Sequence, residues 1–97
     1  MSKINYLEIL ENTNNTIQKL KLDDIQKLNE LSSYLVTMKQ PIVLSEEGTI
    51  EFYTFRAIQN ISLCIDNCRD EYLSKKITLQ EIENKIKRNW KRDYNKF

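Results

Sequence analysis

The stretch ITLQEIENKIKRNWKRDY, residues 77–94, decides the fold. Thr78 and Glu81 stand three residues apart, the spacing of a capping box, in which each side chain accepts a hydrogen bond from the other residue's backbone N–H. Ile77 and Ile82 occupy the positions of the hydrophobic staple that often accompanies such a box. The sequence therefore predicts that a helix begins at Thr78.

Apolar residues recur beyond this start at intervals of three and four. At 100° per residue they fill one arc of about 120° on a helix. The apolar residues are Leu79, Ile82, Ile86, Trp90 and Tyr94. The opposite arc holds Lys85, Arg88, Lys91, Arg92 and Lys96. This pattern predicts an amphipathic helix with one apolar and one basic face.

Residues 49–75 predict a long central helix, because two neighbouring apolar stripes bury a helix on more than one side. The first stripe is Ile50, Tyr53, Ala57, Ile61, Cys64, Cys68 and Tyr72, and the second is Phe55, Ile58 and Ile65. Thr49 suits the N-cap, and Glu51 suits the positive first turn.

A β-hairpin over residues 42–53 is an alternative for the start of this segment. Ile42-Val43-Leu44 and residues 50–53 are rich in β-branched and aromatic side chains, and the four-residue connection between them ends in Gly48. Such a loop is acceptable in a hairpin. The longer helical stripe favours the helix, and the hairpin stays open.

Two further helices are expected in the first half of the chain. In residues 23–38 apolar residues repeat in steps of three and four, Asp23 or Asp24 can cap the start, and Pro41 ends the helix near Gln40. The segment from Ile4 to about Leu20 has a similar pattern, interrupted by the poor helix formers of residues 12–16. That run is a break, a frayed end or an exposed middle turn.

The expected fold is therefore all-α, a small antiparallel bundle of three to four helices in a single domain, residues 1–97. A chain of 97 residues has room for one core. Its composition, 40% apolar and 30% charged, suits a folded domain.

The sequence has few residues that are suited to catalysis or to cofactor binding, and we expect no enzyme and no cofactor. The chain has no histidine, the commonest general base and zinc ligand, and its single glycine excludes phosphate-binding glycine loops. Cys64 and Cys68 lie four residues apart on the apolar stripe, where small core residues are a better interpretation than a metal or redox pair. Asp66, Asp70 and Glu71 form an acidic cluster that is typical of a solvated face, with a metal site as the alternative.

Charge is distributed unevenly along the chain. Residues 1–84 carry nine Lys and Arg against thirteen Asp and Glu, whereas residues 85–97 carry six basic residues against one acidic residue. The predicted binding residues are accordingly Lys85, Arg88, Lys91, Arg92 and Lys96. Cations near a helix C-terminus also complement its dipole and simply solvate the outer face, which is the alternative to a binding role.

The apolar runs and the number of cysteines indicate where in the cell the protein is expected and whether it enters a membrane. The first residues lack the apolar core of a signal peptide, and no uninterrupted apolar run exceeds three residues, against about 20 needed to span a bilayer. Two cysteines are too few for a secreted disulfide framework. We expect a cytoplasmic protein that does not enter a membrane.

Residues 72–82, followed by Trp90, resemble the junction between helices near the end of several small bacteriocin and contact-toxin immunity proteins. The shared residues are generic capping residues, and the chain lacks the strongly acidic surface of that family. The resemblance covers about a fifth of the chain and does not assign it to the family.

The sequence favours a small interaction protein, such as an immunity protein, inhibitor or regulator, that binds a protein partner by shape and charge. Asn, Lys and Ile make up 33 of 97 residues, a bias typical of AT-rich coding DNA in low-GC bacteria, phages and plasmids. Candidate aromatic anchors are Tyr6, Tyr34 and Phe52, which fall off the best apolar stripes. The alternatives are a nucleic-acid-binding regulator that uses the basic helix, and a homo-oligomer.

Overall fold

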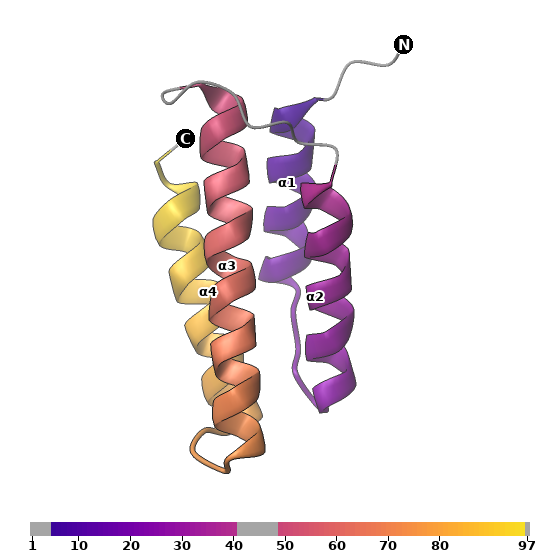
Figure 1. Ribbon diagram of the computed structural model, residues 1–97, viewed down its shortest axis with the longest axis vertical. Helices are drawn as coiled ribbons and strands as arrows, with labels where there is room; N and C mark the ends of the chain where they lie inside the picture. Colours follow the sequence, from indigo (N-terminus) through magenta and orange to yellow (C-terminus); the bar gives the residue numbers. More distant parts are fainter. Residues whose placement is uncertain (1–4, 41–48, 97) are drawn as a thin grey trace.

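The computed structural model describes residues 5–40 and 49–96, and these form four α-helices. The helices are α1 Tyr6–Gln18, α2 Ile25–Lys39, α3 Ile50–Leu73 and α4 Leu79–Tyr94. Consecutive helices run in opposite directions, so the start of α3 and the end of α4 lie at the same end of the molecule (Figure 1). The prediction of an all-α antiparallel bundle is confirmed.

A polar side chain caps the N-terminus of every helix. Asn5, Asp24, Thr49 and Thr78 each accept a hydrogen bond from the backbone N–H three residues further on. At Thr78 the capping box is complete, because the Glu81 carboxylate also accepts from the Thr78 N–H at 3.2 Å. The predicted caps at Thr49 and Thr78 are confirmed, and Asp24 rather than Asp23 caps α2.

Helix α3 lies at the centre of the bundle. It packs against each of the other three helices, and α1 also packs against α4. The buried apolar residues form one continuous core: Leu10, Ile17, Leu22, Leu28, Leu31, Leu35, Ala57, Ile58, Ile61, Ile65, Cys68, Ile82, Ile86 and Trp90. The central position predicted from two adjacent stripes is confirmed.

The possible β-hairpin at 42–53 is wrong over residues 50–53. These residues form the first turn of α3, which the Thr49 hydroxyl caps by accepting from the Phe52 N–H at 3.2 Å. The cap together with the long apolar stripe outweighs the local β-branched and aromatic content. Residues 42–48 of the proposed hairpin lie outside the described residues.

The polar run at residues 12–16 is a continuous part of α1. The Thr16 hydroxyl donates to the Asn12 carbonyl at 2.8 Å. Asn14 faces α4, where its Oδ1 accepts from the indole Nε1 of Trp90 at 3.0 Å. A contact between helices therefore stabilises a segment whose own helix propensity is poor.

The connection between α3 and α4 is short because α3 ends in a Schellman motif. The Lys76 N–H donates to the Glu71 carbonyl at 2.8 Å, and the Lys75 N–H donates to the Tyr72 carbonyl at 3.0 Å. Lys75 has a φ of 60°, in the left-handed region that such a motif requires. The resulting tight turn sets α4 antiparallel to α3.

Candidate interaction surface at the end of α4

The cations predicted as binding residues occupy two different environments. Arg88, Lys91, Arg92 and Lys96 are exposed on α4. Lys85 is half-buried where α4 meets α3, and its Nζ lies 3.8 Å from Oε1 of Glu71. The structure therefore brings four of the five predicted residues to the outer surface and sets Lys85 apart from them.

Ion pairs compensate several of the charged residues along α3 and α4. Besides Lys85, Lys87 approaches the Glu83 carboxylate at 3.5 Å, and Arg69 approaches the Asp66 carboxylate at 3.3 Å. Over residues 5–40 and 49–96, neither Arg88 nor Lys91 forms an ion pair. The positive charges of Arg88 and Lys91 on the C-terminal half of α4 are therefore uncompensated.

A groove of about 470 Å³ runs beside this half of α4, and the last residue of α1 also lines it. We call it the cationic groove; its lining is Gln18, Lys87, Arg88, Lys91, Arg92 and Asn95. Four of these side chains are cations, two are amides, and none is a carboxylate. Such a lining attracts carboxylates or phosphates and provides donors that hydrogen-bond to them.

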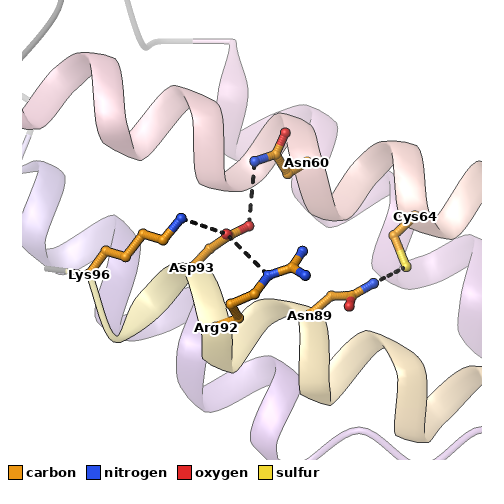
Figure 2. A network of polar contacts seen from close by, with 6 residues as sticks. All are labelled: Asn60, Cys64, Asn89, Arg92, Asp93 and Lys96. Atoms are coloured by element: carbon orange, nitrogen blue, oxygen red, sulfur yellow. Dashed lines mark hydrogen bonds and ion pairs between the residues drawn. The ribbon is translucent and has the colours of Figure 1, made fainter.

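Asp93 connects the end of α4 to α3 (Figure 2). Its Oδ2 accepts a hydrogen bond from Nδ2 of Asn60 on α3 at 3.4 Å. Its Oδ1 lies 4.0 Å from Nε of Arg92 and 3.9 Å from Nζ of Lys96, and the side chain is only 12% exposed. Asp93 thus holds two of the predicted cations near the α3–α4 seam.

A second groove of about 500 Å³ opens on the other side of Asp93, between α3 and α4. We call it the aromatic groove; its lining is Phe52, Tyr53, Arg56, Ala57, Asn60, Asp93 and Lys96. The rings of Phe52 and Tyr53 meet edge to face at 5.7 Å, and the Arg56 guanidinium lies 5.8 Å from the Phe52 ring centre. This site combines apolar surface with two cations.

Tyr53, like Arg56 and Asn60, lines this groove but was not predicted from the sequence as a binding residue. For Tyr53 the sequence pattern was misleading. The apolar stripe placed it in the core, but it is 50% exposed. Asn60 of α3 lies level with Asp93 of α4, and Tyr53 lies seven residues, about 10 Å, nearer the N-terminus of α3. Because α4 ends at Tyr94, no part of that helix covers Tyr53.

The three aromatic residues predicted as exposed anchors differ in their surroundings. Tyr6 and Tyr34 are half-buried and pack against the core. Helix periodicity alone did not reveal these contacts, because the neighbouring helices supply them. Phe52 is also half-buried, but it lines the aromatic groove and remains a candidate for binding.

The two cysteines belong to the packing between α3 and α4. Cys68 is fully buried, and its burial, together with the neighbouring Cys64, raises the pKa of its thiol to about 11. Cys64 is half-buried, and its Sγ accepts from Nδ2 of Asn89 at 3.2 Å (Figure 2). A thiol with so high a pKa is protonated at neutral pH and is a poor nucleophile or metal ligand.

The acidic cluster on α3 is divided between two ion pairs. Asp66 is paired with Arg69, and Glu71 is paired with Lys85, while Asp70 is exposed. Within residues 5–40 and 49–96, no three His, Cys, Asp or Glu side chains come together in a way that would hold a metal ion. In the same ranges, no helix has both the length and the apolar character needed to cross a bilayer.

The described helices define a four-helix bundle with a cationic groove and an aromatic groove beside the end of α4. Comparison of the chain with models of known protein families, with curated proteins and with solved structures finds no match.

Proposed function

We propose that this chain is a small, non-enzymatic interaction protein that binds an acidic surface of a protein partner through the cationic groove. The observation that carries the proposal is the groove lining, which has four cations and two amides but no carboxylate. Inhibitor, immunity protein and regulator are the roles that suit such a module, since each acts by occupying a partner's surface.

The charge distribution supports a compact acidic partner. Arg88 and Lys91 have no ion-pair partner among the described residues, so a carboxylate that enters the groove displaces no internal pair at these two positions. Exposed cations of this kind accelerate association and fix orientation more than they add affinity. The exposed carboxylate of Asp70 on α3, which forms no ion pair among the described residues, would repel an anion that extended along the whole molecule.

Nucleic acid is the second candidate, because phosphates suit the same cations. The position of Trp90, the aromatic residue within the basic run of α4, argues against the stacking of bases in the cationic groove. Trp90 is only 1% exposed, and its ring stacks on Tyr94 at 5.8 Å inside the bundle. The net charge of +1 is also small for a nucleic-acid-binding domain.

A binding assay with two polyanions tests this proposal. Fluorescence anisotropy would follow labelled poly-glutamate and labelled mixed-sequence single-stranded DNA over about 50–200 mM salt. We expect poly-glutamate to bind, with an affinity that falls as salt rises. The triple variant Arg88→Gln, Lys91→Gln, Arg92→Gln should bind about tenfold more weakly, because each exposed charge contributes about 0.5 kcal/mol.

The matched control removes three exposed cations elsewhere, at Lys27, Lys75 and Lys76, again by replacement with Gln. This variant has the same net charge as the groove variant. If the groove is the site, it should keep the wild-type affinity, because none of its three substitutions lies in the groove lining. Equal weakening by both variants would show that only net charge matters. Tight DNA binding without poly-glutamate binding would replace the proposal by the nucleic-acid function.

A further inference from the structure

The aromatic groove and the cationic groove both border the end of α4. Arg92 lines the cationic groove, and its Nε lies 4.0 Å from Asp93, which lines the aromatic groove. A partner segment that reaches the last turns of α4 can therefore contact both grooves at once.

The aromatic groove has the composition of an anchor pocket. Tyr53 is 50% exposed and Phe52 is half-buried, so apolar surface remains accessible to an incoming side chain. Exposed Tyr and Arg beside a recess are the residue types that contribute most to protein interfaces. A volume of about 500 Å³ accommodates an aromatic side chain together with its neighbouring backbone.

The charged residues at the edge of the aromatic groove determine which charges an incoming segment can carry beside its aromatic side chain. Arg56 and Lys96 are exposed cations on the two sides of the groove. The one carboxylate in its lining, Asp93, is largely buried and already contacts Asn60, Arg92 and Lys96. The accessible charge is thus positive, which favours carboxylates and opposes a cationic occupant.

We infer that the aromatic groove binds an aromatic side chain of the partner, carried in a segment rich in Asp and Glu. This inference rests on the proposed function and adds the partner's recognition element to it. Tyr53 packs against the incoming ring, while Arg56 and Lys96 contact the flanking carboxylates.

Two synthetic peptides of equal length and charge test the inference. One has a central Trp flanked by Glu residues, and the other has Ala in place of that Trp. We expect the Trp peptide to bind the wild-type protein about tenfold more tightly than the Ala peptide. Tyr53→Ala should abolish that difference without weakening the Ala peptide, whereas Tyr53→Phe, which keeps the ring, should preserve the difference.

Leu63→Ala provides a matched control on the same helix. Leu63 is 54% exposed and lies outside the lining of the aromatic groove, so its truncation should leave the gain from Trp unchanged. Circular dichroism of each variant establishes that the helices are intact.

The outcomes separate the inference from the function on which it rests. Equal binding of both peptides to the wild-type protein would overturn the anchor pocket while leaving the cationic groove as the binding site. Failure of both peptides to bind would overturn both. A single-stranded DNA that displaces the Trp peptide, and that Tyr53→Ala weakens, would show that the groove accepts a base instead of a protein side chain.

Discussion

Trp90 and Thr13 are both buried and both carry a polar side-chain atom, but only that of Trp90 has a hydrogen-bond partner among the described residues. The indole N–H of Trp90 has an acceptor in Asn14, although the two residues are 76 positions apart in the chain. The Thr13 side chain is fully buried in α1, and its Oγ1 has no hydrogen-bond partner among the described residues. A buried polar atom without a partner destabilises the folded state because it has lost its hydration.

Replacement of Thr13 by Val should therefore stabilise the protein. Val has almost the same shape as Thr and removes the unpaired hydroxyl, which predicts a gain of about 1 kcal/mol in the free energy of unfolding. For a domain of this size that gain raises Tm by about 4–8 °C. Thermal and urea denaturation followed by circular dichroism would measure it.

Thr16→Val is the control for this prediction. The Thr16 hydroxyl donates to the Asn12 carbonyl and is not fully buried, so its loss should bring no comparable gain. A Thr13→Val protein that unfolds at a lower temperature than the wild type would contradict the assignment of an unsatisfied hydroxyl.

At the scale of elements, one carboxylate joins α4 to the connection between α1 and α2. Oε1 of Glu83 accepts a hydrogen bond from the Leu22 N–H at 2.7 Å, and Oε2 of the same carboxylate lies 3.5 Å from Nζ of Lys87. The pKa of the Glu83 carboxyl lies below its usual 4.5, mainly because its carboxylate accepts the hydrogen bond from the Leu22 N–H and, to a smaller extent, because the positive charge of Lys87 is close. This contact fixes the position of the α1–α2 connection against α4.

The lowered pKa of Glu83 predicts a loss of stability in acid. The unfolded chain binds a proton at Glu83 near pH 4.5, whereas the folded chain does so only at lower pH. The contribution of Glu83 is therefore present above pH 4.5 and disappears as the pH falls through the lower, folded pKa. Wild-type protein should be more stable than Glu83→Gln at pH 7, and the difference should vanish in strong acid.

Urea denaturation of both proteins at a series of pH values between 7 and about 2 would measure this difference. Glu30→Gln serves as the control, since Glu30 is exposed on α2 and accepts no hydrogen bond from the described residues. A constant difference between wild type and Glu83→Gln at all pH values would exclude a role for the charge.

At the scale of the whole molecule, the described helices form an elongated bundle of 44 × 24 × 20 Å. The exposed large apolar residues are distributed over three helices: Leu7, Val36, Ile50, Tyr53, Leu63 and Leu73. Stable homodimer interfaces are usually large and continuous apolar surfaces. Since α3 already packs against the other three helices of the same chain, its core is complete without a second copy.

We therefore expect a monomer of 11.6 kDa in sedimentation equilibrium at micromolar concentration. The mass should not change with salt. A dimer would contradict this expectation, and a dimer that Tyr53→Ala dissociates would identify a second copy as the occupant of the aromatic groove.

Local patterns in the sequence determined the four helices and the caps at Thr49 and Thr78. Thr78 and Glu81 specify the start of α4 by contacts within one turn, and the stripe from Ile50 to Tyr72 specifies α3 by its period of 3.6 residues. Both signals act over a few residues, so they can be recognised before any tertiary contact is known. The concentration of basic residues on α4 is likewise a property of the sequence itself.

Only the tertiary structure decided which of these residues are accessible and what they face. Lys85 and Arg88 look equivalent on a helical projection, but Glu71 of α3 pairs with Lys85, whereas Arg88 lines the cationic groove. Tyr53 looks like a core residue until the end of α4 leaves it uncovered. The physical reason is that exposure and pairing depend on contacts between helices far apart in the chain, which periodicity within one helix does not encode.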